Sequence, residues 1–239
     1  MSQDVDGLVR EALLGGIGPD MNKQGFQSFS VFYSNPYVTL KKGDYYIVGL
    51  NPGGAGESQE EINEYEWIQV NWGLTPKSAY LIEDDPTWDK KNLQRNMQLF
   101  ANCWLQDDKK LRDIFSTNAI FARSPHVDSL NEKTRDLFEL CWPWHHRFLD
   151  IIRPRIIIAI SNDDTKPSAF NLFRDRLQEH STEEPIKVYG RYSIKRCSGK
   201  IDLSPGQVEV RLVGLPHLSR CNVAGQRDVI SKLKKDCWL

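Results

Sequence analysis

The sequence predicts an α/β fold, a three-layer αβα sandwich with a central, mostly parallel sheet. Short apolar segments typical of buried strands occur at 45–50, 114–121, 156–160, 186–189 and 208–215, and helical patterns separate most of them. Strands that alternate with helices are typical of a parallel sheet covered on both faces. With 239 residues, 40% of them hydrophobic, the chain can form one domain over residues 1–239.

The first half of the chain begins with a helical pattern at residues 1–14, which the glycines at 15, 16 and 18 are expected to end. We treat residues 1–44 as an N-terminal helical and loop extension. The buried strand at 45–50 then leads directly into a glycine-rich turn. Residues 57–90 are acidic and aromatic without a clear period, which predicts an irregular insertion with one or two helical turns. A helix over 91–105 and a strand over 114–121 follow.

The second half repeats this alternation. A helix is predicted over 131–152, ended by Arg153-Pro154. The uninterrupted apolar run at 156–160 is typical of a central parallel strand. A helix around 167–179, strands at 186–189 and 208–215, and a last helix over 223–233 complete the predicted order.

Composition excludes several classes of protein. The net charge of -1 and the isoelectric point near 6.5 give no overall basic character, so DNA binding would need a local patch. Five scattered cysteines without a CxxC pair argue against a disulfide framework and a compact zinc site. The first residues are acidic, without the basic-then-apolar order of a signal peptide, and no apolar run approaches membrane-spanning length. We therefore expect a cytoplasmic protein (nuclear in a eukaryote) that binds neither metal nor membrane.

Three polar residues lie in or just after predicted strands: Asn51 after the strand at 45–50, Asn118 inside the strand at 114–121, and His217 after the strand at 208–215. Ligands of open α/β sheets bind outside the carboxyl ends of the strands, so these side chains could form one site. A buried asparagine facing a cleft offers a donor and an acceptor side by side, which matches the edge of a pyrimidine. Each residue also has a purely structural explanation: a turn of the Asn-Pro-Gly type, a core asparagine that holds a loop, and a polar loop histidine.

Several segments resemble the uracil-DNA glycosylase superfamily, in the same order. The segment after the first strand is similar to the first motif of the mismatch-specific and single-strand-selective branches: Tyr46-Ile47-Val48-Gly49-Leu50-Asn51-Pro52-Gly53. A second resembles the base-reading stretch of the iron–sulfur branch: Thr117-Asn118-Ala119-Ile120-Phe121-Ala122-Arg123-Ser124-Pro125. Cys141-Trp142-Pro143 and residues 152–160 continue the resemblance, and Pro216-His217-Leu218-Ser219-Arg220 takes the place of the His-Pro-Ser motif.

The resemblance implies a monofunctional glycosylase that hydrolyses the N-glycosidic bond of uracil or a related damaged base in DNA, as in base excision repair. Its partner would be DNA with such a base, it would need no cofactor, and it would act as a monomer. Asn51 would position the attacking water, and His217 would donate a hydrogen bond to the leaving base. Residues implied to hold the base are Gly49, Leu50, Pro52, Gly53, Asn118 and Phe121, with Tyr65 as another stacking candidate. Ser219 and Arg220 would contact DNA.

The sequence also departs from the family. Only Cys141 matches a cluster cysteine of the iron–sulfur branch, so no cluster can form. No proline follows His217, and Arg220 replaces a second proline. Acidic residues follow the first motif: Glu57, Glu60, Glu61, Glu64 and Glu66. These departures leave open a protein that binds a nucleotide, nucleobase or nucleic acid without base release. An interaction protein with exposed tryptophans (Trp67, Trp72, Trp142, Trp144) is a third possibility.

Overall fold

The computed structural model describes residues 4–26, 28–53, 64–81, 83–84, 91–124, 130, 133–189, 192–220 and 223–237. Its helices and strands follow in this order: α1 (Val5–Arg10), η1 (Glu11–Gly16), α2 (Ile17–Lys23), α3 (Pro36–Thr39), β1 (Tyr45–Gly49), α4 (Glu64–Asn71), α5 (Lys91–Leu105), η2 (Asp108–Asp113), β2 (Phe115–Asn118), α6 (Thr134–Ile152), β3 (Ile156–Ile160), α7 (Ala169–Arg174), β4 (Gln178–Tyr189), β5 (Tyr192–Asp202), β6 (Gln207–Leu215), η5 (Val223–Gln226) and α8 (Arg227–Cys237). Here η1 is a π-helix, and η2 and η5 are 3-10 helices.

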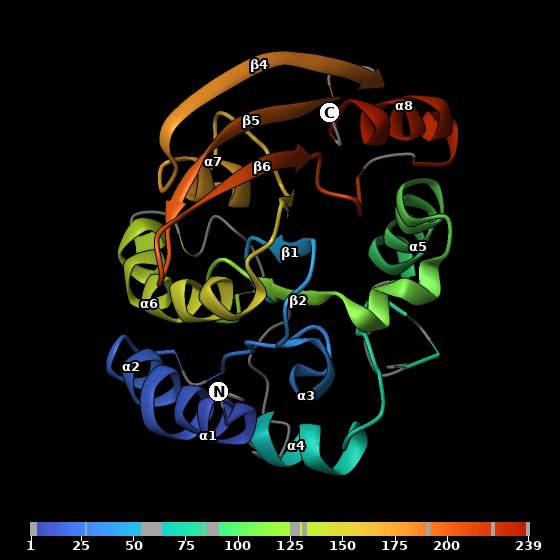
Figure 1. Ribbon diagram of the computed structural model, residues 1–239. Helices are drawn as coiled ribbons and strands as arrows, with labels where there is room; N and C mark the ends of the chain where they lie inside the picture. The colour runs from blue at the N-terminus through green and yellow to red at the C-terminus, as the bar shows by residue number, and fades with distance from the viewer. Residues whose placement is uncertain are drawn as a thin grey trace.

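The described strands form one six-stranded sheet in the order β2-β1-β3-β6-β5-β4. The first four are parallel, whereas β5 pairs antiparallel with β6 and β4 antiparallel with β5. Helices α6 and α7 lie on one side of the sheet and α5 and α8 on the other (Figure 1). The structure thus confirms the predicted three-layer α/β fold with a mostly parallel sheet. Within the described ranges, no helix combines the length and apolar character needed to cross a membrane.

The register brings the carboxyl ends of four strands together. Gly49, the last residue of β1, is in register with Asn118 at the end of β2 and with Ile160 at the end of β3. Ile160 is in turn in register with Leu215, the last residue of β6. We call this common end of β2, β1, β3 and β6 the carboxyl edge.

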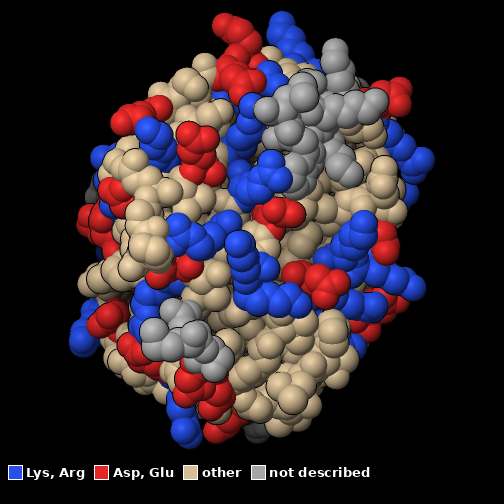
Figure 2. Space-filling view, in the orientation of Figure 1, with Lys and Arg blue, Asp and Glu red and all other residues tan. Residues whose placement is uncertain are grey.

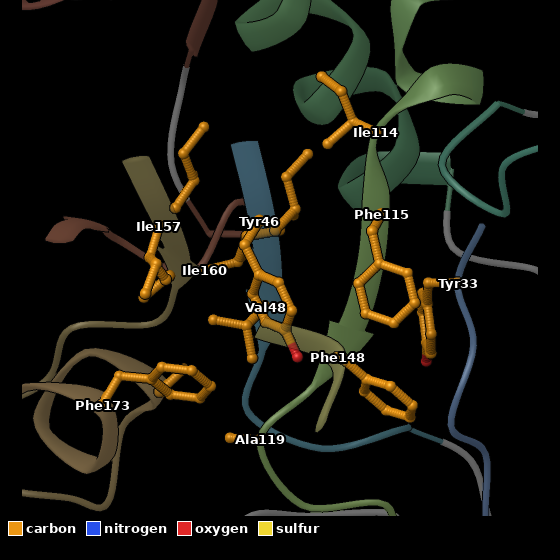
Figure 3. Close-up of a cluster of buried hydrophobic side chains, with 14 of the residues drawn as sticks. Tyr33, Tyr46, Val48, Ile114, Phe115, Ala119, Phe148, Ile157, Ile160 and Phe173 are labelled. Atoms are coloured by element: carbon orange, nitrogen blue, oxygen red, sulfur yellow. The ribbon is translucent and has the colours of Figure 1, made fainter. Parts of the chain in front are cut away.

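Aromatic packing fixes α6 against the sheet. Tyr46 and Phe115 extend from neighbouring strands to the same side, and Phe148 of α6 packs below Phe115 (Figure 3). The ring centroid of Phe115 lies 5.3 Å from that of Tyr46 and 5.2 Å from that of Phe148, and all three residues are buried. Burial of each large aromatic side chain stabilises the fold by about 2–3 kcal/mol. The strands that carry the predicted site therefore rest on a rigid core.

The N-terminal extension covers the outer edge of β2. Residues 29–33 run beside this strand, with an antiparallel bridge between Phe32 and Thr117. The main-chain N–H of Ser30 donates to the carbonyl of Phe121 at 2.9 Å, beyond the end of the strand. An uncovered strand edge invites pairing with other chains. The extension is therefore an integral part of the sheet layer.

Glu64, at the start of α4, fastens this covering segment. Its carboxylate accepts hydrogen bonds from the main-chain N–H groups of Val31 (2.8 Å) and Phe32 (2.9 Å) and from the hydroxyl of Ser30 (3.2 Å). Burial raises the pKa of Glu64 to about 7, although these hydrogen bonds and the charge of Arg123 act to lower it. Glu64 is thus engaged by the protein itself, while Glu57, Glu60 and Glu61 lie outside the described residues.

The prediction that glycines end the first helix is wrong. Helical structure continues through α1, η1 and α2, from Val5 to Lys23. The glycine at 16 instead allows the helix to approach Trp144 closely, because a Cβ there would lie 2.3 Å from the ring of this tryptophan. Pro19 is accommodated in the first turn of α2, where a missing N–H is tolerated. A close approach to a distant tryptophan cannot be read from local sequence.

Other boundaries also differ from the prediction. Strand β2 ends at Asn118, so Phe121 lies in the following loop. Of the helix predicted around 167–179, only α7 forms. Strand β4 already begins at Gln178, and the short strand expected at 186–189 is the end of this long strand, which forms a hairpin with β5. The insertion at 57–90 contains α4, and Pro143 lies inside α6. Strands of the hairpin are rich in exposed polar residues, as is common at the antiparallel end of a sheet, and therefore lack a strong apolar signal.

Candidate active site

The carboxyl edge brings the three predicted polar residues to one end of the sheet. Asn118 is the last residue of β2, Asn51 comes two residues after β1, and His217 two residues after β6. Ser161 follows β3 directly and lies between them in strand order. With a strand spacing of about 4.8 Å, the edge from β2 to β6 is about 14 Å wide. This width accommodates a flat heterocycle with its sugar.

The loops after β1 and β2 are joined into one unit. Hydrogen bonds from the β2 loop to main-chain carbonyls of the β1 loop are Ala119 N–H to Gly49 (2.8 Å), Ile120 N–H to Leu50 (2.9 Å), Ser124 N–H to Pro52 (3.1 Å) and Arg123 Nη1 to Gly53 (3.2 Å). All four residues predicted in the β1 loop as base-binding are thus held by the neighbouring loop. The joined loops fix Asn51 relative to Asn118.

Asn118 presents a buried donor without a partner. Its residue is 3% exposed, and Nδ2 makes no hydrogen bond within the part of the chain that the structure describes. The other amide atom, Oδ1, lies against Gly49, where an added Cβ would be only 2.3 Å away. A buried donor left unpaired destabilises a fold by about 1–3 kcal/mol, so such groups call for an explanation. A bound molecule with an acceptor atom would supply the missing partner.

Asn51 presents an acceptor at the same edge. It is half-buried, and its Nδ2 donates to the carbonyl of Pro52 at 3.0 Å. This bond orients the amide and leaves Oδ1 without a hydrogen bond to any described residue. An oriented amide oxygen can hold a water molecule, but it cannot take up a proton as a carboxylate does.

His217 is exposed, and its loop determines which ring nitrogen carries the proton. The hydroxyl of Ser219 lies 2.8 Å from Nδ1, and the main-chain N–H of Ser219 donates to the same nitrogen at 3.4 Å. Nδ1 therefore acts as the acceptor, so the proton of the neutral ring is on Nε2, which can donate to a ligand. The loop is anchored because Asn96 of α5 donates to the carbonyl of Leu218 at 2.7 Å.

Phe121 belongs to the core and not to the surface of the edge. It is fully buried, its ring centroid lies 5.0 Å from that of His145, and its main-chain N–H points to the sulfur of Cys141 at 3.4 Å. Stacking on a base would require this ring to leave its packing. Tyr65, the other stacking candidate, bonds to Asp6 through its hydroxyl at 3.2 Å.

A buried histidine supports the position of Asn118. His145 of α6 lies between the hydroxyl of Tyr46 (2.7 Å from Nδ1) and the carbonyl of Ala119 (3.0 Å from Nε2). The carbonyl can only accept, so Nε2 carries the proton and Nδ1 accepts from the tyrosine. Burial lowers the pKa of His145 to about 4, which keeps the ring neutral. In the sequence, this histidine could be found only as a polar residue on the apolar face of a helix.

Ser161 has an uncommon backbone conformation. Its φ of 143° lies in the region that favours glycine, and such a conformation destabilises a fold by about 1–3 kcal/mol. Nothing in the local sequence indicates it, because the conformation depends on a contact with another strand. The N–H of Ser161 donates to the carbonyl of Leu215, at the end of β6.

Three basic residues of β5 are paired with carboxylates. The ammonium of Lys195 contacts Asp164, Arg196 lies 2.9 Å from Glu183, and Lys200 lies 2.5 Å from Glu179. Figure 2 shows basic side chains across the middle of one face, with acidic side chains beside many of them. Arg220 is exposed in the loop after His217. A phosphate contact from this region would thus depend mainly on the His217 loop.

Metal chemistry finds no support in the described residues. They contain no group of three or more histidine, cysteine or carboxylate side chains that could hold a metal ion. Cys141 is buried, and burial raises the pKa of its thiol to about 12, so it stays protonated.

A cavity of the described surface lies elsewhere. It has a volume of about 490 Å³, and none of the residues of the carboxyl edge lines it; its lining is Thr75, Pro76, Lys77, Asp84, Lys109, Arg112 and Asp113. An apolar space of about 20 Å³ lies behind the His217 loop, between Leu215, Leu218 and Ile230. Neither cavity is lined by Asn51, Asn118 or His217.

The tryptophans suggested as an interaction surface are not exposed. Trp72 is 3% and Trp144 is 9% exposed, and Trp67 and Trp142 are partly buried against the core. These four side chains thus contribute to packing.

No protein-family model matches the sequence, and a comparison with curated proteins finds no match either. What this chain does must therefore be inferred from the carboxyl edge and its motifs.

Proposed function

We propose that this protein is a DNA glycosylase that hydrolyses the N-glycosidic bond of uracil or a related damaged base. The observation that carries the proposal is the buried amide nitrogen of Asn118, which has no partner among the described residues and lies at the same end of the sheet as Asn51 and His217. A base-sized ligand with an acceptor atom would satisfy this amide. The sequence motifs that resemble uracil-DNA glycosylases contain the same three residues.

Asn118 would recognise the base. An amide carries a donor and an acceptor side by side, and the edge of uracil presents a carbonyl oxygen next to an N–H. Gly49 makes room for this amide, because any side chain there would displace its oxygen. His145 and the joined loops hold the amide in place, so recognition would need little reorganisation.

Asn51 and His217 would act on the bond itself. In the reaction, the bond between C1′ of the sugar and the base nitrogen breaks, and a water oxygen forms a new bond to C1′. Asn51 Oδ1 would hold this water, and since it cannot accept the proton, we expect a modest rate. His217 would donate through Nε2 to the base oxygen on which negative charge develops.

DNA contacts would centre on the His217 loop. Arg220 is exposed there and can meet a phosphate, while Ser219 orients the histidine. The near-neutral net charge gives little further attraction for DNA. Because extrusion of a base from a duplex requires a few kcal/mol, single-stranded or mismatched uracil should be preferred.

The test is release of uracil from an oligonucleotide with one deoxyuridine, without added metal. We expect release by the wild-type protein and a loss of about a hundredfold or more in rate for Asn51→Ala and for His217→Ala. His180→Ala, at an exposed histidine of β4, is the control and should keep full activity. Absence of release from single-stranded, matched and mismatched substrates by folded protein would refute the proposal.

A second candidate function is binding of a nucleobase or nucleotide without cleavage. The altered His217 motif favours it, because no proline follows His217 and Arg220 replaces a second proline of the motif that it resembles. Calorimetric binding of uracil or deoxyuridine that depends on Asn118, without base release, would support this alternative.

A further inference from the structure

Ser161 is a polar residue of the carboxyl edge to which the chemistry above gives no role. It follows Ile160 of β3, which is in register with the last residues of both β1 and β6. Ser161 therefore lies between the loop that carries Asn51 and the loop that carries His217.

The fold holds the backbone of Ser161 in a conformation that suits glycine. Its φ is 143°, its N–H donates to the carbonyl of Leu215 at 3.1 Å, and its carbonyl accepts from the N–H of Phe170 at 3.0 Å. The next residue, Asn162, is locked as well, since its Nδ2 donates to two main-chain carbonyls of β5 and β6 at 2.7 and 2.8 Å. Glycine would adopt this conformation without strain. Backbone geometry thus does not account for a serine here.

The hydroxyl of Ser161 is available for a ligand. The residue is 8% exposed, and its Oγ makes no hydrogen bond among the described residues. Strained residues that the surrounding structure holds firmly occur preferentially at functional sites. We propose that Ser161 is a further substrate-binding residue, whose hydroxyl hydrogen bonds to a polar oxygen of the nucleotide held between Asn51 and His217. This assignment rests on the proposed function and extends it.

Three variants separate the hydroxyl from the backbone strain. Ser161→Ala removes the hydroxyl and keeps the strain, whereas Ser161→Gly removes both. Gln106→Gly is the matched control, because Gln106 is an exposed residue with a φ of 65° after α5. Each variant is compared with the wild type for kcat and KM of uracil release, for Kd of the same oligonucleotide by fluorescence anisotropy, and for Tm.

We expect both Ser161 variants to lower kcat/KM by about five- to tenfold, mainly through KM, as for loss of one neutral hydrogen bond. Ser161→Gly should at the same time raise Tm by about 2–4 °C, whereas Ser161→Ala should leave it unchanged. Gln106→Gly should raise Tm and keep full activity.

Unchanged kcat/KM and Kd in both Ser161 variants would overturn the assignment while leaving the proposed function intact. A loss only in Ser161→Gly would overturn it too, because backbone rigidity and not the hydroxyl would then matter. If the wild type binds the oligonucleotide without releasing uracil, the same fold-change is expected in Kd alone. A wild type that neither releases uracil nor binds the oligonucleotide would overturn the proposed function and this assignment together.

Discussion

Two polar clusters of this protein differ in whether their groups are satisfied. Asp84, whose side chain is 1% exposed, accepts two hydrogen bonds of 2.8 Å from Arg112, one from the N–H of Ser78 at 3.1 Å and one from Lys77 at 3.4 Å. It lines the cavity of about 490 Å³, yet the protein itself supplies its partners. Asn118, at the carboxyl edge, is also buried, but its amide nitrogen has no partner among the residues that the structure describes. For this reason we place the proposed site at the unsatisfied amide nitrogen of Asn118 and not at the cavity beside Asp84.

The largest expected effect is on stability, in the Asp84 cluster. Asp84→Ala should lower the free energy of unfolding by about 3 kcal/mol, because it leaves two cationic side chains without their buried partner. Urea unfolding measures this change, and the rate of base release by the folded variant should stay unchanged. Asp175→Ala removes a half-exposed carboxylate paired with Arg174 and should change stability by less than about 0.5 kcal/mol. A fall in activity without a fall in stability for Asp84→Ala would remove the contrast between the clusters.

The opposite pattern is expected at Asn118. Asn118→Ala should reduce uracil release by about a hundredfold, while the free energy of unfolding stays within about 1 kcal/mol of the wild type. Stability is maintained because the substitution removes a donor that has no partner among the described residues. Activity assays and urea unfolding on the same preparation test both halves. A large loss of stability with normal activity of the remaining folded protein would show that Asn118 is a structural core residue.

The smallest effect is on the pH dependence of wild-type stability, since two buried groups oppose each other. His145 has a pKa of about 4 in the folded chain and an ordinary value of 6.5, so the unfolded chain binds more protons there between pH 4 and 6.5. This site makes the free energy of unfolding rise with pH. Glu64 has a pKa of about 7 against an ordinary 4.5, so the folded chain binds more protons between pH 4.5 and 7. That site makes the free energy of unfolding fall as the pH rises.

Between pH 5 and 6.5 the two contributions nearly cancel, so wild-type stability should change little. Glu64→Gln leaves only the histidine, and stability should then rise by about 1–2 kcal/mol over this range. His145→Gln can keep both hydrogen bonds without titrating, and stability should then fall by a similar amount. Unfolding in urea at several pH values distinguishes these slopes. Parallel pH profiles for the two variants would show that these groups do not titrate as described.

The parts of the fold that could be predicted are those with a clear pattern of apolar residues along the chain. The apolar runs of β1 and β3 identified the central strands, and their succession with helices gave the layers. The hairpin of β4 and β5 was missed because most of its side chains are polar and at least partly exposed, so the sequence contains no apolar run there. The glycine at 16 was read as a helix end, although it makes room for Trp144 from another helix. Signals that depend on a distant contact are invisible in a single sequence.

The same limit applied to the candidate site. Asn51 and His217 could be proposed because each follows a recognisable strand, and Asn118 because it is a polar residue inside an apolar strand, although the end of β2 at Asn118 was not predicted. Ser161 and His145 were not, since one depends on hydrogen bonds to the end of β6 and the other on its contact with the carbonyl of Ala119. Phe121 was assigned to the base because its place in the motif says nothing about the core around it.

The strip of chain at 29–33 has a consequence for any shortened form of the protein. A polypeptide starting at residue 45 would retain all the strands and every polar residue of the carboxyl edge, but the N–H and C=O groups along one side of β2 would be bare. Bare groups of this kind recruit strands from other molecules. Such a fragment would tend to aggregate, and the loss of Val31 and Phe32 would also leave the Glu64 carboxylate without its amide donors.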